Sequence, residues 1–155
     1  MGVIESTALG LAMRQSMWLY PVVEIVHLVG IALLVGSIAV FDLRLIGFSR
    51  GLSVRRLAAH LLPWTLASFL LILPSGFMMF AAHASDFIAS NVFALKMCLI
   101  LAAGTNAALF HAGAMRGAVN WDVDAMPPPA ARAAGALSLL LWVSVIACGR
   151  LLAYT

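Results

Sequence analysis

The chain has 155 residues, of which 64% are hydrophobic and 10% are charged, with a formal net charge of +3 at pH 7. Its mean hydropathy of +1.07 lies far above that of a soluble domain. These values exclude an ordinary water-soluble enzyme and predict an integral membrane protein. The small positive charge gives no reason to expect a nucleic-acid partner, and we interpret it as a signal of membrane topology.

Four apolar segments are long enough to cross a bilayer, because ~30 Å of hydrocarbon requires a helix of about 20 residues. They run over residues 18–41, 58–82, 92–113 and 133–153. Their continuous apolar character differs from the period-two pattern of a membrane β-barrel. The sequence therefore predicts an all-α integral membrane protein, a single domain over residues 1–155 built as an up-down bundle of four transmembrane helices.

The segment before the first span is predicted to be an interfacial lead-in, because Glu5 stands where a signal peptide has positive charge. Most arginines fall in the two connections on one side of the bundle. These are Arg44, Arg50, Arg55, Arg56, Arg116 and Arg132. The positive-inside rule places these connections in the cytoplasm and both termini on the non-cytoplasmic side. We expect Asp42 and Arg44 to form a solvated or paired set at the inner interface.

The first span carries Glu24 and His27 in an otherwise apolar run. A polar group inside a span is costly in lipid and is a functional candidate by default. Helical spacing puts Glu24 and His27 on one face, so we expect both to point inward, with Glu24 orienting the imidazole as a hydrogen-bond acceptor. A purely structural histidine is the alternative.

The second span has a histidine at each end. His60 opens it beside Arg55 and Arg56, and His83 stands where it leaves the membrane on the opposite side. The two arginines are candidates to pair with the propionates of a haem. Histidines near an interface are also common without any ligand role, and this alternative stays open for His60 and His83.

The third span ends at His111, at a depth similar to that of His60 in an up-down bundle. Gly104 shares the face of His111 and leaves room for a macrocycle, although small residues also serve close helix packing. Two imidazoles on facing helices are the ligands of a b-type haem. We therefore predict one haem between His60 and His111, and a second at His27, with His83 as its possible partner.

A copper site is the alternative cofactor. His27 and His83 lie toward the same side as Met78, Met79 and Cys98, and imidazole, thioether and thiolate groups are copper ligands. Methionine is also ordinary filler of a helix bundle. The sequence contains no arrangement typical of a hydrolytic nucleophile and base.

Three short motifs carry a family resemblance. They are E-x-x-H at Glu24 and His27, N-x-F-x-x-K from Asn91 to Lys96, and N-A-x-x-F-H from Asn106 to His111. With the apolar sequence around them they resemble a family of small bacterial inner-membrane proteins of uncharacterised function. That family is similar to CopD-like copper-resistance membrane domains and to four-helix b-type membrane cytochromes. The resemblance implies a bacterial inner (plasma) membrane and a haem or copper cofactor, without choosing between them.

The predicted function is electron transfer by one or two b-type haems, from a quinol or membrane donor to a partner redox protein. The four spans leave little chain for a soluble catalytic domain, so we expect a redox subunit in a homo-oligomer or a larger membrane complex. The alternatives are a copper-binding or copper-transport protein and a structural subunit without a cofactor.

Overall fold

The computed structural model describes residues 3–154, and no strand occurs in that range. Four helices are long and apolar enough to span a membrane: α2 (Leu19–Ile46), α3 (Val54–Ala82), α5 (Asn91–Ala112) and α6 (Pro129–Leu151). The shorter elements are α1 (Ala8–Gln15), α4 (Ala84–Ala89) and the 3-10 helix η1 (Ala114–Trp121). The predicted all-α four-helix membrane bundle is confirmed, and the chain is a multi-pass membrane protein.

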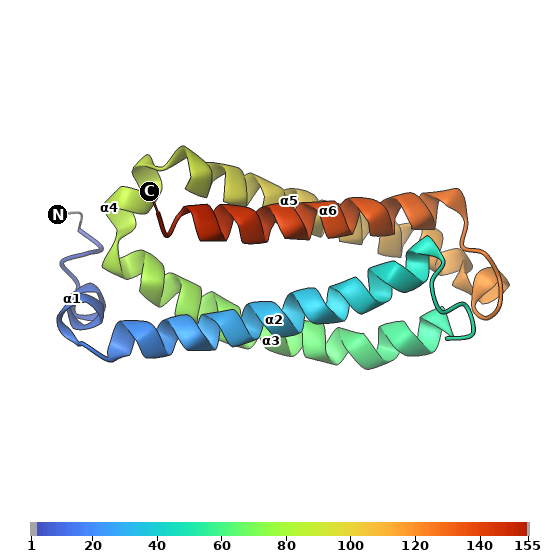
Figure 1. Ribbon diagram of the computed structural model, residues 1–155, viewed down its shortest axis with the longest axis horizontal. Helices are drawn as coiled ribbons and strands as arrows, with labels where there is room; N and C mark the ends of the chain where they lie inside the picture. Colours follow the sequence, from blue (N-terminus) through green and yellow to red (C-terminus); the bar gives the residue numbers. More distant parts are fainter. Residues whose placement is uncertain (1–2, 155) are drawn as a thin grey trace.

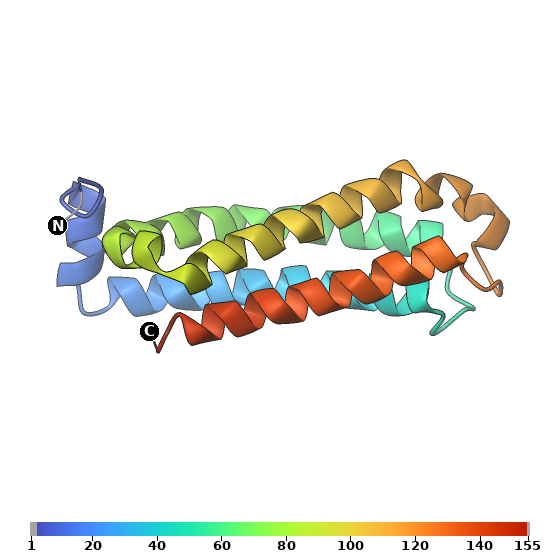
Figure 2. The same ribbon diagram turned by 90° about the horizontal axis from the view of Figure 1, so that it is seen from above.

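The long helices run antiparallel to their neighbours in the chain (Figure 1). The first and last described residues lie at one end of the bundle, which we call the terminal end. The opposite end, with connections 47–53 and 113–128, is the loop end. The pair α5 and α6 crosses the pair α2 and α3 obliquely (Figure 2). Helix α2 packs against α3 and α6, and α5 packs against α6.

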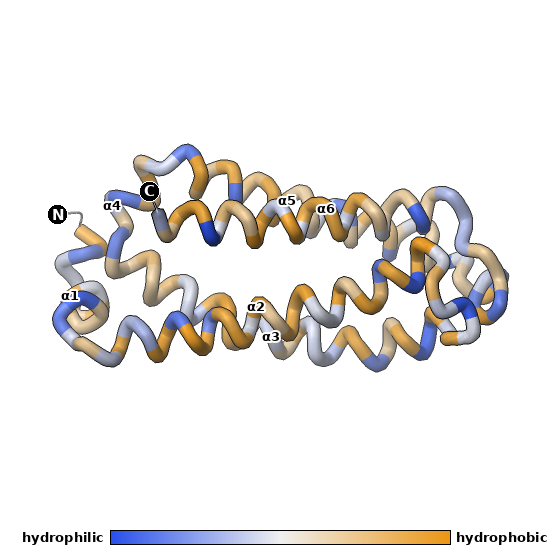
Figure 3. Tube along the Cα trace, viewed as in Figure 1, coloured by the Kyte–Doolittle hydropathy of each residue, from blue (hydrophilic) through white to orange (hydrophobic). Residues whose placement is uncertain are grey.

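The apolar surface of the bundle suits lipid. Hydrophobic residues dominate the four long helices, and most hydrophilic residues lie toward the two ends and in the connections (Figure 3). Large apolar side chains point outward along the helices, including Leu70 at 76% and Leu101 at 70% exposure. Such exposure would be unfavourable in water and is favourable in a bilayer.

Three of the four long helices, α2, α3 and α6, extend further at the loop end than the predicted spans. Helix α2 continues to Ile46 and ends at Gly47, whose left-handed φ of 119° favours glycine. Helix α3 begins at Val54, because the Ser53 hydroxyl caps its N-terminus. Helix α6 begins at Pro129, since a proline is tolerated in the first turn of a helix.

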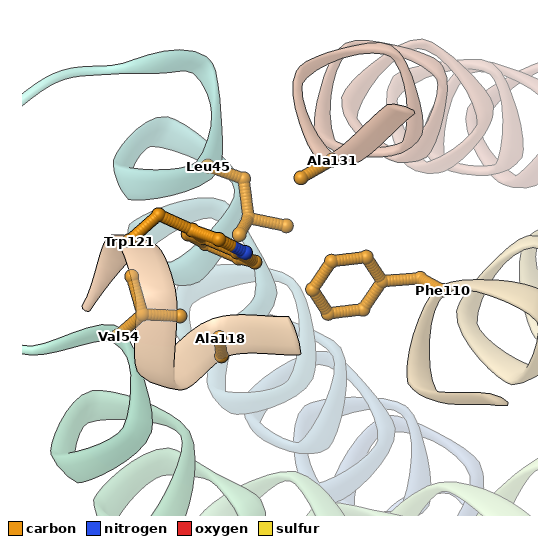
Figure 4. Packing of buried hydrophobic residues seen from close by; sticks show 6 residues of the cluster. All are labelled: Leu45, Val54, Phe110, Ala118, Trp121 and Ala131. Atoms are coloured by element: carbon orange, nitrogen blue, oxygen red, sulfur yellow. The ribbon is translucent and has the colours of Figure 1, made fainter. Parts of the chain in front are cut away.

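A buried cluster closes the loop end of the bundle. Phe110 of α5 and Trp121 of η1 point toward each other across it, and both lie near Leu45 of α2 (Figure 4). Val54, Ala118 and Ala131 complete the cluster. The cluster thus joins all four long helices to η1.

Arg44 also holds the loop end together, and the prediction of a solvated or paired interfacial set is wrong for it. Its side chain is 1% exposed. Its guanidinium donates to the carbonyl oxygens of Leu52 at 2.8 Å, Arg50 at 3.1 Å and Asp122 at 3.0 Å. Because these carbonyls belong to both long connections, Arg44 fastens the α2–α3 loop to the segment after η1.

The Asp122 carboxylate strengthens the same junction. It accepts hydrogen bonds from the backbone N–H of Arg55 at 2.8 Å and from the Ser53 hydroxyl at 2.9 Å. The bond from the Arg55 backbone is the main cause that lowers the pKa of Asp122 below its ordinary value, with Ser53 contributing in the same direction. A residue distant in sequence thus caps the start of α3.

The predicted interfacial lead-in contains a short helix. Thr7 caps α1, and Met13 is buried against the terminal end of the bundle. The buried Glu5 carboxylate accepts a hydrogen bond from the backbone of Ser85 at 2.7 Å. The lead-in is therefore tied to α4 by this hydrogen bond.

Candidate functional site

A cavity of ≈ 530 Å³ lies among the four long helices, between the middle of the bundle and the loop end. Its volume falls within the ~300–1,000 Å³ of pockets that hold small molecules and cofactors. The walls are mostly apolar, and the polar side chains on them include Asp42, Arg55, Asn106, His111 and Ser138. An apolar cavity with a few polar groups suits an amphipathic ligand.

Three of the predicted site residues line this cavity. Arg55 comes from α3, and Gly104 and His111 come from α5. A Cβ atom placed on Gly104 would meet no other atom within 4 Å, so the glycine borders open space. A cation, an imidazole and free volume are therefore available to one occupant.

His60 does not join them. It borders a separate surface groove with Arg56 and Asp122. Ala58 and Leu62 of α3 line the central cavity, and His60 is two residues from each. Residues two apart on a helix do not share a face. The structure therefore does not bring the predicted ligand pair His60 and His111 together, and it separates Arg56 from Arg55.

His27 forms an interhelical hydrogen bond. Its Nδ1 lies 2.9 Å from the Ser75 hydroxyl of α3. The Ser75 hydroxyl also donates to the carbonyl of Leu71, so Ser75 links the imidazole of His27 to the backbone of α3. Glu24 is exposed on α2. Ser75 thus has the orienting role that the sequence suggested for Glu24.

His83 lies in a different setting from His27. It ends α3 at the terminal end, packs edge-on against Tyr20 with 5.9 Å between ring centroids, and places Nδ1 3.7 Å from the Asp86 carboxylate. Within residues 3–154, no three His, Cys, Asp or Glu side chains form a group able to hold a metal ion. The copper alternative, which also involves Met78, Met79 and Cys98, stays a prediction.

Helices α3 and α5 make no close backbone contact, although Phe80 of α3 stacks on Phe93 of α5 with 5.8 Å between ring centroids. Over the described lengths of α3 and α5, no Cα atom of one helix lies within 8 Å of a Cα atom of the other. Both helices nevertheless contribute to the cavity wall, with small residues such as Ala59 and Ala107. The cavity is thus bordered by two helices whose backbones lie apart.

Residues 4–155 match a family of unknown function designated DUF6644. The chain belongs to this family. No curated protein and no solved structure matches the chain. The match to DUF6644 includes every residue of the cavity wall. The resemblance to CopD-like domains and to membrane cytochromes stays a prediction.

For Asp42 of this DUF6644 protein, too, the prediction of a solvated or paired interfacial set is wrong. Asp42 is 4% exposed and lines the cavity. The Ser138 hydroxyl of α6 hydrogen-bonds its carboxyl group. Among the described residues, Asp42 Oδ2 has no hydrogen-bond partner. Extending the first predicted span beyond residue 41 would have placed this acid inside the bundle.

Proposed function

We propose that this protein is a membrane electron-transfer subunit that holds one b-type haem in the central cavity, with His111 as its protein ligand. The observation that carries the proposal is that one cavity of ≈ 530 Å³ is lined by His111, Arg55 and the open space beside Gly104. When bound, haem supplies one-electron chemistry.

The residues on the cavity fit a haem with one protein ligand and do not fit the pair His60 and His111. An imidazole nitrogen of His111 would bind the iron. The Arg55 guanidinium would pair with propionate carboxylates. The apolar walls would exclude water and favour the macrocycle over the aqueous phase.

The proposed setting is the bacterial inner membrane, with the loop end in the cytoplasm. Its support is the concentration of arginines in the two connections at the loop end, together with the positive-inside rule. In this setting the protein passes electrons between a quinol or other membrane donor and a partner redox protein. The face of the bundle between α3 and α5 also suits contact with a second subunit.

Absorption spectra of the detergent-purified protein, first air-oxidised and then reduced with dithionite, test the proposal. The wild type is expected to show haem bands of a high-spin form, because one histidine faces the cavity. His111→Ala is expected to lose at least tenfold in bound haem. His60→Ala is the matched control and is expected to keep the wild-type haem content.

Three results would contradict the proposal. A colourless protein after expression with haem supplied would favour a structural subunit, and copper in a metal analysis of that sample would favour the copper alternative. A sharp low-spin band that disappears in both histidine variants would restore the pair His60 and His111.

A further inference from the structure

We infer that Asp42 takes up a proton when the haem of the central cavity gains an electron, so that reduction of this protein is proton-coupled. The inference rests on the proposed function. It assigns a role to the one carboxyl group on the cavity wall among residues 3–154.

The position of Asp42 carries the inference. The side chain is 4% exposed, yet it borders the cavity together with His111 and Arg55. Its backbone is fixed from α6, because Gly135 packs so closely that a Cβ there would lie 3.0 Å from the Asp42 carbonyl oxygen. The carboxyl group therefore stays at the cavity wall.

The hydrogen bonding of Asp42 is incomplete. Ser138 hydrogen-bonds the carboxyl group, whereas Oδ2 has no partner within residues 3–154. A buried polar atom without a partner is costly, and an unpaired carboxylate among apolar side chains is more costly still. Protonation removes the charge and gives the carboxyl group a hydrogen-bond donor. The protonation state of Asp42 can therefore change when the charge in the cavity changes.

Few other charged or titratable groups face the cavity. Arg55 comes from α3 and His111 from α5, and the α6 residues of the wall are uncharged. Arg44 is near in sequence, but its guanidinium donates to loop carbonyls at the loop end. Asp42 is therefore the acidic group on which an added electron acts most directly.

The coupled step is balanced in charge and atoms. With haem bound, one electron from a quinol-class donor would reduce ferric to ferrous iron, and one proton from the aqueous phase would convert the Asp42 carboxylate to the carboxylic acid. The negative charge of the electron is then compensated by the proton within the same cavity. In a low-dielectric interior this compensation is strong.

Redox titration of the haem-loaded protein between pH 5 and 9 tests the inference. A tenfold change in proton concentration corresponds to about 59 mV for a one-electron couple. The midpoint potential of the wild type is expected to fall with rising pH. Over part of the range the slope should approach about 59 mV per pH unit. Asp42→Asn, which keeps the side-chain shape, is expected to abolish the slope. Asp86→Asn is the matched control, since Asp86 is exposed at the terminal end.

Ser138→Ala provides a second variant. Because Ser138 hydrogen-bonds the Asp42 carboxyl group, its loss is expected to shift the pH range over which the potential changes. A potential independent of pH in the wild type, or an unchanged slope in Asp42→Asn, would overturn the inference while leaving the haem proposal intact. A wild-type protein without haem bands fails before the titration and would overturn both.

Discussion

The two polar side chains of α2 at the loop end, Asp42 and Arg44, are both buried and serve different purposes. Arg44 is engaged by three backbone carbonyls, which is a structural use of a charge. Asp42 lines the central cavity; its Oδ2, like Arg44 Nη1, has no hydrogen-bond partner within residues 3–154. Their spacing of two residues turns the side chains in different directions on the helix.

Arg44→Ala is expected to destabilise the fold strongly. It removes all three hydrogen bonds from a charged donor, each worth about 1.5–3 kcal/mol, and leaves buried carbonyls without partners. Thermal unfolding in detergent measures the effect. Arg44→Lys should recover only part of the lost stability, because lysine keeps the charge but its ammonium group lacks the planar, multiply donating geometry of a guanidinium.

The exposed Arg132 supplies the control. Arg132→Ala is expected to change the melting temperature little. Equal losses in Arg44→Ala and Arg132→Ala would contradict the structural role of Arg44.

Asp122 is expected to make the stability of the loop end depend on pH. Its pKa is lowered in the folded state, chiefly by the hydrogen bond from the Arg55 backbone. The stabilisation is therefore fully present above the unfolded value of about 3.9 and is lost as the pH falls through the lower folded value. Melting temperatures measured between pH 3 and 7 should fall less steeply for Asp122→Asn than for the wild type.

At neutral pH Asp122→Asn should be less stable than the wild type by about 1–2 kcal/mol, as for loss of a helix cap. Asp86→Asn, with an exposed acid, should keep the wild-type pH dependence. Parallel pH profiles for Asp122→Asn and the wild type would show that Asp122 does not stabilise the loop end.

At the scale of elements, glycines set the distance between α2 and α3. A Cβ on Gly30 would lie 2.7 Å from Ile72 Cγ1, closer than real Cβ contacts come, and 3.1 Å from Leu71 Cβ, which is tighter than most. Gly36, on the same helix, has no atom within 4 Å of such a Cβ. The two positions therefore differ in packing and not in helix propensity.

Gly30→Ala is expected to lower stability by about 1–3 kcal/mol through overpacking. Gly36→Ala should be neutral or more stable by up to ~1 kcal/mol, because alanine is the better helix former. Chemical or thermal unfolding of both variants in detergent checks this. A loss in Gly36→Ala as large as that in Gly30→Ala would contradict the packing of α2 on α3.

The sequence predicted which segments form membrane-spanning helices better than it predicted which side of a helix each polar side chain occupies in the bundle. Spans of apolar residues are visible without a structure, because the thickness of the bilayer fixes their length. The depth of His60 could be counted along the chain, but its direction depends on how α3 is rotated in the bundle. A difference of one residue turns a side chain by about 100° around the helix. Arg55 therefore lines the central cavity, whereas Arg56 lines the surface groove beside His60.

Helix ends were a second limit of the sequence. The predicted first span stopped at residue 41, which left Asp42 outside it. The structure continues α2 to Ile46, since Phe41 and Leu45 find partners in Phe110 and in the loop-end cluster. The partner of His27 could not be predicted either, because Ser75 reaches it from another helix.

At the scale of the whole molecule, the helices are held closely together at the loop end, whereas the backbones of α3 and α5 lie apart. The loop-end cluster and the hydrogen bonds of Arg44 hold the connections together. Helices α3 and α5, by contrast, make no close backbone contact along their described lengths. The central cavity therefore lies between a closed loop end and two helices whose backbones stay apart.

The most direct test of the account is the haem content of Gly104→Leu compared with that of Gly36→Leu, measured per mole of folded protein. Both glycines border open space, but only Gly104 lines the cavity. We expect Gly104→Leu to lose most of its haem and Gly36→Leu to keep the wild-type content, with both variants folded. Equal haem content in the two variants would contradict the assignment of haem to the central cavity.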